Sequence, residues 1–206
     1  MGEKLLINDV STSQKVVAIT FDDGPNPIFT AQVLEIFREA EGKATFFMIG
    51  EQMDKHPEMV KKVVEQGHEI GNHTYTHPKL SQLSLAECLD EIERTEKLLE
   101  ELVGQKPVVF RPPYLDYNQD TILIMQQKDY PMIGALNMDA QDWEMPGVDH
   151  ILVKSRDCVK NGSILIFHDG YGDRSQTIEA VRILVSELTS QGYQLVTVSE
   201  LLKLSI

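Results

Sequence analysis

The chain alternates short runs rich in β-branched and aromatic residues with stretches of helical periodicity. This alternation constrains the fold most, because strands that are separated by helices pair in parallel. The helical pattern over residues 84–104 is the clearest: Ser84 and Glu87 form a capping box, and Gly104 ends the helix. A second pattern covers residues 174–192. The expected strands are residues 15–21, 43–49, 68–72, 107–110, 131–138, 163–168 and 193–198.

A chain of 206 residues with this pattern fits a single α/β domain. We assign residues 1–14 to an N-terminal extension and residues 15–206 to the domain. The parallel sheet is either open or closed into a barrel. No G-x-G-x-x-G motif follows the first strand, which weighs against a dinucleotide-binding fold. Polar motif residues follow five different strands, and a barrel gathers such strand ends around one mouth.

Charge and terminal sequence limit the partners and the compartment. A net charge of −13 disfavours nucleic acids and anionic membranes, because both are negatively charged. No apolar run approaches the roughly 20 residues that span a bilayer, so we expect no membrane span. The first residues do not form a signal peptide. We therefore expect a cytoplasmic protein, or an extracellular or cell-envelope protein whose export signal has been removed. Cys88 and Cys158 lack metal-binding spacing and are expected to be free thiols.

Two adjacent aspartates, Asp22 and Asp23, end the first expected strand in the sequence FDDGP. One of them could cap the helix that begins near Ile28, but a capping residue should lie closer to that helix, and a cap explains only one aspartate. Since side chains alternate along a strand, we expect the two carboxylates to point in different directions. One could then bind a metal while the other handles a proton.

His73 and His77 lie in the sequence GNHTYTHP, after the third expected strand. Pro78 and Gly71 disfavour a helix here, so we predict a turn that folds both imidazoles toward one point. Two histidines and one aspartate form a three-ligand set with open positions, which is typical of a catalytic metal site. These ligand types suit Zn²⁺, Co²⁺, Ni²⁺ or Fe²⁺.

Three further strand ends carry polar residues. Arg111 follows the fourth expected strand and precedes two prolines. Asp139, Asp142 and Trp143, the only tryptophan, follow the fifth strand, and His168 ends the sixth. Each of these residues alone has an ordinary structural explanation. Gathered at one end of a β/α barrel, they indicate an active site.

In these motifs the chain resembles the polysaccharide deacetylases of carbohydrate esterase family 4 (CE4), which include chitooligosaccharide, chitin and peptidoglycan deacetylases. The resemblance covers roughly residues 15–203, and the motifs appear in the family's order. It implies a distorted, incomplete (β/α) barrel, in agreement with about seven parallel strands. It also implies metal-dependent removal of N-acetyl groups from glycans that contain N-acetylglucosamine, with release of acetate. The motifs are TFDDGPN (20–26), HTYTH (73–77), RPPY (111–114), DAQDW (139–143) and the strand end at His168.

The resemblance implies a metal site and a base. Asp23, His73 and His77 are expected to bind one divalent ion, with Zn²⁺ as the first choice and Co²⁺ or Ni²⁺ as alternatives. Asp22 is the expected general base. Arg111 is expected to orient that base and to favour its ionised form.

The resemblance also implies an acid and a substrate groove. His168 is the expected general acid, and Asp142 pairs with it and raises its pKa. The backbone N–H of Tyr114 is expected to stabilise the oxyanion, and Trp143 to wall the groove. The residues expected along the substrate site are Pro112, Tyr114, Leu115 and Trp143.

Leu115 departs from the family's usual pattern, which has glycine after the tyrosine of the third motif. Leucine adopts positive φ only at an energetic cost, whereas glycine does so freely. We therefore expect the backbone beside Tyr114 to run differently here. We also expect the leucine side chain to crowd the rim of the groove.

Two other functions remain open. A non-haem Fe(II) oxygenase also uses two histidines and a carboxylate, but the β/α alternation argues against the double-stranded β-helix on which such enzymes normally sit. The other is a non-catalytic carbohydrate-binding member of the same fold. Leu115 alone favours it, while Asp22, Asp142 and His168 argue against it. The sequence leaves the preferred glycan and the oligomeric state open.

Overall fold

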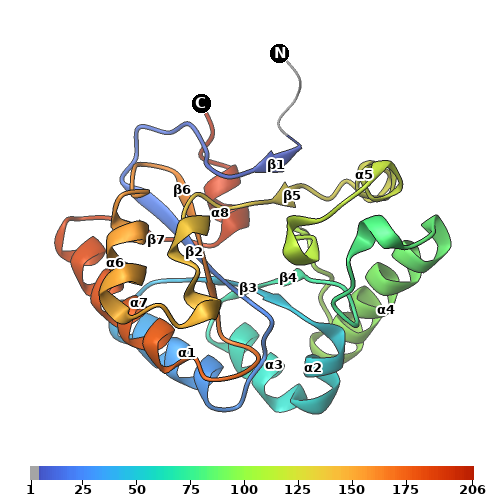
Figure 1. Ribbon diagram of the computed structural model, residues 1–206, viewed down its shortest axis with the longest axis horizontal. Helices are drawn as coiled ribbons and strands as arrows, with labels where there is room; N and C mark the ends of the chain where they lie inside the picture. The colour runs from blue at the N-terminus through green and yellow to red at the C-terminus, as the bar shows by residue number, and fades with distance from the viewer. Residues whose placement is uncertain (1–4) are drawn as a thin grey trace.

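The structure, a computed structural model that describes residues 5–206, is an α/β barrel whose strands pair in parallel (Figure 1). The main sheet has the strand order β4-β3-β2-β6, and β7 pairs with the first residues of β2. A second sheet pairs β1 with β5. The parallel α/β architecture confirms the fold class predicted from the sequence. The strands are β1 (Leu6–Ile7), β2 (Val16–Asp22), β3 (Thr45–Met48), β4 (Glu69–Asn72), β5 (Met132–Ile133), β6 (Ser163–His168) and β7 (Gln194–Leu195).

Short bridges complete the barrel wall where full strands are missing, so the barrel is distorted and incomplete. Phe110 bridges Asn72 of β4 and Met132 of β5. On the opposite side, the N–H of Ile164 in β6 donates to the carbonyl of Asn8 at 3.2 Å. The segment after β1 thus reaches the edge of β6. Residues that we assigned to the N-terminal extension therefore take part in the barrel wall.

Residues 107–110 do not form the strand that the sequence predicted, and only Phe110 makes a bridge. Pro107 has no N–H to donate to a ladder. Val108 is 53% exposed, so this part of the run faces solvent. The apolar pattern PVVF therefore marks a contact point between β4 and β5 and not a full strand.

The predicted strand over 131–138 shortens to the two residues of β5. A Cβ added at Gly134 would lie 1.9 Å from Oδ1 of Asn8, so this glycine permits a close approach of the N-terminal segment. The chain then leaves the regular ladder and enters a 3₁₀-helix, η3 (Met138–Ala140).

The predicted strand over 193–198 also shortens, because its last residues start a helix. Thr197 and Glu200 form a capping box for α8 (Val198–Leu202). This T-x-x-E pattern in the sequence marks the start of a helix, so the expected strand extended too far at its end.

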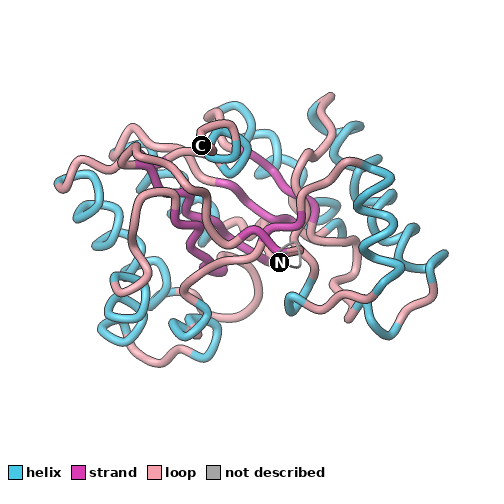
Figure 2. Tube along the Cα trace, turned by 90° about the horizontal axis from the view of Figure 1, so that it is seen from above, coloured by secondary structure: helices cyan, strands magenta, loops and turns pink. Residues whose placement is uncertain are grey.

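Helices surround the strands on the outside of the barrel (Figure 2). The two helices predicted most clearly are confirmed: α4 has the Ser84–Glu87 capping box and ends at Gly104 with φ 70°, and α7 covers most of the second pattern. No helix among residues 5–206 is long and apolar enough to cross a membrane. The α-helices are α1 (Phe29–Glu39), α2 (Gly50–Lys55), α3 (Pro57–Glu65), α4 (Leu85–Val103), α5 (Gln119–Lys128), α6 (Val148–Arg156), α7 (Ser175–Ser190) and α8 (Val198–Leu202).

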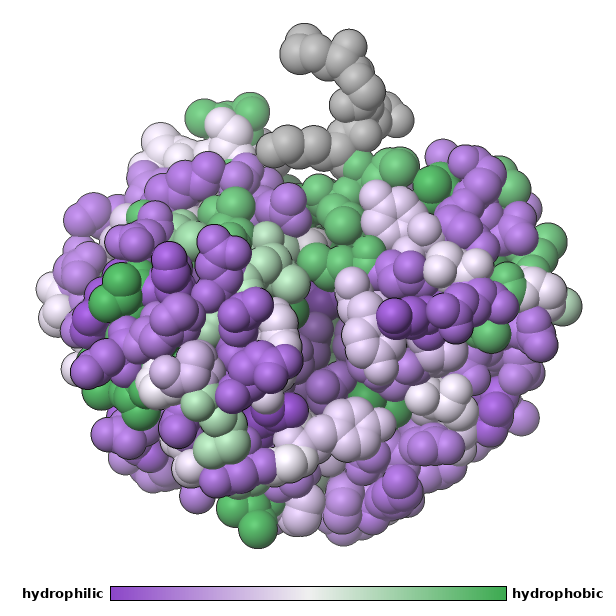
Figure 3. Space-filling view, in the orientation of Figure 1, coloured by the Kyte–Doolittle hydropathy of each residue, from purple (hydrophilic) through white to green (hydrophobic). Residues whose placement is uncertain are grey.

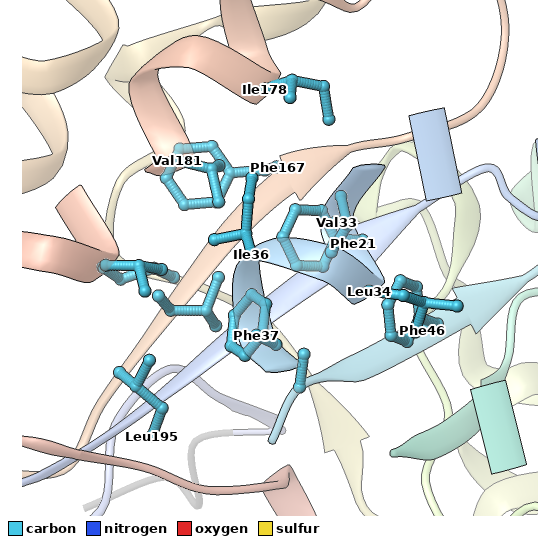
Figure 4. Close-up of a cluster of buried hydrophobic side chains, with 14 of the residues drawn as sticks. Phe21, Val33, Leu34, Ile36, Phe37, Phe46, Phe167, Ile178, Val181 and Leu195 are labelled. Atoms are coloured by element: carbon cyan, nitrogen blue, oxygen red, sulfur yellow. The ribbon is translucent and has the colours of Figure 1, made fainter. Parts of the chain in front are cut away.

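Side chains of β2 alternate between two environments, and this alternation positions the site. Val17, Ile19 and Phe21 pack in the main core cluster with residues of α1 and α7. Figure 4 shows Phe21 in this cluster beside Phe37 of α1. Val16 and Ala18 pack in a second cluster, to which β3, β5 and β6 also contribute, inside the barrel. Burial of each of the larger apolar side chains stabilises the fold by about 1.5–3 kcal/mol. The side chains that point into the barrel continue along β2 to Asp22 at its carboxyl end.

The surface on the side seen in Figure 1 is mostly hydrophilic and is hollowed near its centre (Figure 3). Parallel strands of a β/α barrel direct their carboxyl ends to one mouth. In this protein β2, β4 and β6 end there in Asp22, Asn72 and His168.

Candidate active site

The three predicted metal ligands lie together. One ligand atom from each of Asp23, His73 and His77 lies within 4.8 Å of the other two. The distance from Asp23 Oδ1 to Nε2 is 3.6 Å for His73 and 3.2 Å for His77. Asp23 follows β2, and both histidines lie in the loop after β4. The turn predicted after the third expected strand thus folds both imidazoles toward one point.

Hydrogen bonding fixes the form of His73. Its Nδ1 lies 2.7 Å from the carbonyl oxygen of Arg111. A carbonyl only accepts hydrogen bonds, so Nδ1 carries a proton and Nε2 is the nitrogen that faces Asp23. Burial lowers the pKa of His77, and the neighbouring His73 lowers it further, to about 4. The imidazole of His77 is therefore held in the neutral form that binds metals.

Asp23 offers an oxygen that lacks a protein partner. Its Oδ1 is buried and has no hydrogen-bond donor among residues 5–206. Burial raises the pKa of Asp23, but the nearby imidazole of His73 and the charges of His168 and His77 outweigh it and lower the pKa to about 2. A buried ionised oxygen is costly unless a positive charge pairs with it. The donor set of two nitrogens and one oxygen therefore fits a divalent metal ion with open positions.

The two adjacent carboxylates do not diverge as strand alternation alone predicted. Nε2 of His73 lies 3.7 Å from Asp22 Oδ2 and 3.6 Å from Asp23 Oδ1. Asp23 has φ 74°, so the backbone leaves the extended conformation and turns its side chain back toward that of Asp22. The two aspartates differ instead in their second contacts, since Asp23 reaches His77 and Asp22 binds Arg111.

Arg111 holds Asp22 from inside the barrel. Its guanidinium is fully buried, and Nη1 donates to Asp22 Oδ1 at 2.6 Å and to Thr20 Oγ1 at 2.7 Å. Nε donates to the carbonyl of Ile133 and Nη2 to that of Gly134. A buried guanidinium requires such partners. Asp22 Oδ1 is therefore occupied, while Oδ2 lies on the side of His73.

Neither aspartate caps the helix after FDDGP. Oδ1 of Asn26 accepts hydrogen bonds from the N–H groups of Ile28 and Phe29 at 2.9 and 3.0 Å. Gly24 lets the loop approach the end of β6, because a Cβ there would lie 2.6 Å from Oδ1 of Asp169. The loop therefore leaves both aspartates available to the site.

A hydrogen-bonded acid–base pair, His168 and the buried Asp142, lies at the same groove as the three candidate metal ligands. His168 Nδ1 lies 2.8 Å from Asp142 Oδ1, and Asp142 Oδ2 accepts the backbone N–H of His168 at 2.8 Å. The hydroxyl of Thr177 donates to the same Oδ2 at 3.0 Å. Burial lowers the pKa of His168, but the charge and hydrogen bond of Asp142 outweigh it and, with the charges of Asp22 and Asp23, raise the pKa to about 9. The imidazole is thus held in its protonated form.

Most predicted site residues line one open groove of about 510 Å³. Arg111 and Asp142 are buried behind its wall and act through Asp22 and His168. The ring of Trp143 meets the imidazole of His168 edge-on at 5.2 Å between centroids. The predicted residues along the groove are Asp22, Asp23, His73, His77, Pro112, Tyr114, Leu115, Trp143 and His168.

Leu115 adopts the left-handed conformation that glycine takes freely. Its φ is 53°, and that of Tyr114 is 58°. The expectation that leucine would avoid this conformation is therefore wrong. The turn explains why: the N–H groups of Leu115 and Asp116 donate to the carbonyls of Pro112 and Pro113, and this tight turn fixes the backbone. The cost is about 1–2 kcal/mol for each such residue.

Other parts of the site were absent from the sequence prediction. Thr177 and Arg174 carry no motif spacing that marks them. The Nε of Arg174 donates to the carbonyl of Gly170 at 2.7 Å, which braces the loop after His168. Asp139, in contrast, is exposed and does not line the groove. The additional groove residues are Thr76, Met138, Ile166, Tyr171 and Arg174.

Together the barrel, the three-ligand site and the His168–Asp142 pair are those of a metal-dependent hydrolase. The chain belongs to the polysaccharide deacetylase family, whose family model matches residues 9–133. A peptidoglycan-N-acetylglucosamine deacetylase of Bacillus cereus is 41% identical over 196 residues, which cover 95% of this chain and 92% of that protein. A chitooligosaccharide deacetylase of Bradyrhizobium sp. is 34% identical over 91% of this chain and 90% of its own length.

Solved structures of related proteins have the same fold. The Bc1960 peptidoglycan N-acetylglucosamine deacetylase superposes with a TM-score of 0.90 at 30% identity, covering 96% of this chain and 92% of that chain. A CE4 family pseudoenzyme from Bacillus anthracis superposes with a TM-score of 0.84 at 29% identity, covering 93% of this chain and 66% of that chain. The same fold thus occurs with and without activity, so the site residues must carry the functional argument.

Proposed function

We propose that this protein hydrolyses N-acetyl groups of N-acetylglucosamine units in peptidoglycan or chitooligosaccharides and releases acetate. The observation that carries the proposal is the meeting of the ligand set Asp23, His73 and His77 with the His168–Asp142 pair at one groove. Relatives named for deacetylation of these two glycan types support the substrate class.

The ligand set defines where a metal would act. A divalent ion held by Asp23, His73 and His77 would supply Lewis-acid chemistry to the acetyl carbonyl and to a water molecule. We infer Zn²⁺ as this ion, because it suits two imidazoles and a carboxylate with open positions, with Co²⁺ or Ni²⁺ as alternatives.

In this proposal Asp22 accepts the proton of the attacking water. Arg111 occupies Oδ1 and orients the carboxylate, so Oδ2 is the oxygen on the ligand side. A general base needs such a fixed orientation, because it must lie within hydrogen-bond reach of the proton that it accepts. Asp23 is turned to the ligand set instead, and the two neighbours divide the work.

In this proposal His168 donates a proton to the leaving nitrogen. Asp142 binds Nδ1, so Nε2 is the donating atom. The backbone N–H of Tyr114, at the rim of the groove, would stabilise the oxyanion, and Trp143 would pack against the sugar. The products are acetate and a glycan with a free amine.

Acetate release tests this proposal. Metal-free protein should release little acetate from either glycan, and adding Zn²⁺, Co²⁺ or Ni²⁺ should restore release. Glycan binding without acetate release under all three metals would favour a non-catalytic binding protein. Turnover that requires O₂ and Fe²⁺ would favour the oxygenase instead. Either result would overturn the deacetylase proposal.

A further inference from the structure

The loop that carries His73 and His77 is held by a residue outside the groove. Glu91 lies in α4, and its Oε2 accepts hydrogen bonds from the N–H groups of Tyr75 at 2.9 Å and Thr76 at 2.7 Å. Its Oε1 accepts the hydroxyl of Thr76 at 2.8 Å. All three bonds therefore end on the residues between the two histidine ligands.

The surroundings of Glu91 show that these bonds are its main stabilisation. The residue is only 8% exposed, and no ion pair among residues 5–206 includes it. A buried carboxylate without a cation is costly unless hydrogen bonds satisfy it. The loop donors meet that need, so the buried charge and the loop conformation depend on each other.

The same helix also holds the start of the loop. The carbonyl of Ile92 accepts Nδ2 of Asn72 at 2.9 Å, and Oδ1 of Asn72 accepts the N–H of Thr74 at 2.9 Å. The hydroxyl of Thr74 then accepts the N–H of His77 at 3.1 Å. Thr74 and His77 have φ of 65° and 63°, a conformation that non-glycine residues rarely adopt without support.

We propose that Glu91 is a positioning residue for metal binding, which presets the loop so that Nε2 of His77 faces Asp23 before an ion arrives. This proposal rests on the metal site of the proposed function. Glu91 does not line the groove, so its effect would pass through the backbone of Tyr75 and Thr76.

Two substitutions separate geometry from charge. Glu91→Ala removes all three acceptors, and affinity for Zn²⁺ should fall by about tenfold or more, as is typical when groups that orient metal ligands are lost. Glu91→Gln should stay close to wild type. Its amide oxygen can accept both N–H groups, and its amide nitrogen can donate to the Thr76 hydroxyl. Glu101→Ala, an exposed glutamate of the same helix, is the matched control.

Calorimetric titration of the full metal-free chain with Zn²⁺ gives the affinities, and amide hydrogen exchange at Tyr75 and Thr76 reports the loop. Exchange at both amides should be faster in Glu91→Ala than in wild type or Glu91→Gln. If Glu91→Ala does not fold, Thr76→Val provides the test, since Thr76 is exposed and this change removes only the hydroxyl bond. It should weaken Zn²⁺ binding by less than tenfold but measurably.

The outcomes distinguish this proposal from the proposed function. Equal Zn²⁺ affinities of wild type and Glu91→Ala, or of wild type and Thr76→Val where only that variant folds, would overturn the role of Glu91 alone. Equal losses in Glu91→Ala and Glu91→Gln would show that charge and not positioning matters, and would also overturn it. Absence of Zn²⁺, Co²⁺ and Ni²⁺ binding by the wild-type chain would overturn the metal site itself, and this proposal with it.

Discussion

His77 and His168 are two imidazoles of one groove with opposite acid–base character. Burial and the neighbouring His73 hold the pKa of His77 down at about 4. Burial also lowers the pKa of His168, yet Asp142 outweighs it and raises the pKa to about 9. The difference comes from the contacts: Asp142 accepts Nδ1 of His168 at 2.8 Å, whereas the carboxylate near His77 is shared with His73.

This contrast shows how a chain prepares one side of a groove for a metal and the other for proton transfer. A ligand histidine must be neutral, and an acid histidine must be charged. Both sides use a carboxylate, but Asp142 serves one imidazole and Asp23 faces two. Substitutions that disturb one side should therefore spare the function of the other.

Asp22→Asn should give the largest effect on turnover. The amide keeps the shape of the side chain but cannot accept a proton, so acetate release should fall by about 10²–10⁴-fold. Metal content, measured by elemental analysis, should stay near the wild-type value, because Asp22 is held by Arg111 and not by the ligand set. Asp139→Asn, an exposed position outside the groove, is the control. Loss of metal with the rate would show that the two aspartates share one task.

Asp23→Ala should act on the ligand side. It removes the oxygen that both imidazoles face, so metal affinity should fall by about 10–100-fold or more. Excess metal should restore part of the acetate release, which Asp22→Asn would not show. Unchanged metal affinity in calorimetric titration would contradict the assignment of Asp23 as a ligand.

Asp142→Asn should shift the alkaline limb of the pH–rate profile to lower pH. The pKa of His168 is raised to about 9, so the wild-type imidazole keeps its proton until the pH approaches that value, and activity falls above it. A bound cation nearby would move this limb downward in both proteins. Without Asp142, burial remains uncompensated and the proton is lost at lower pH. Rates measured from pH 5 to 10 for both proteins would reveal the shift, and superimposable profiles would contradict it.

Leu115→Gly should have the smallest effect. Glycine relieves a left-handed strain of about 1–2 kcal/mol but loses more backbone entropy on folding, so the melting temperature should rise slightly. The wider rim should also broaden glycan preference. Leu115→Ala keeps a Cβ at φ 53° but removes the bulk, so it separates strain from crowding. An unchanged ratio of chitooligosaccharide to peptidoglycan activity in both variants would show that Leu115 does not select substrates.

Local signals in the sequence predicted the chemistry better than the surroundings of the site. The nearly continuous apolar run that ends at Asp22 marks β2, and the motifs marked His73, His77 and His168. The sequence could not show that φ of Asp23 would turn both carboxylates toward His73, because strand periodicity stops there.

The other features that the sequence did not predict depend on contacts between segments that are distant in the chain. Thr177 reaches Asp142 across 35 residues, and Glu91 reaches Thr76 across 15, with no spacing rule that links them. The two-residue strand β1 is too short to show a period. The start of α8, in contrast, could be predicted from the sequence, because Thr197 and Glu200 form a local capping box.

The protonation states of His77 and His168 test the account most directly. Imidazole nitrogen shifts followed by NMR in the metal-free protein, assigned through His77→Gln and His168→Gln, would give both titrations. At pH 6.5 we expect His77 to be neutral and His168 to be charged, with apparent pKa values near 4 and near 9. Two histidines that titrate together near the ordinary value of about 6.5, or in the reverse order, would contradict the division of the groove into a ligand side and a proton-donating side.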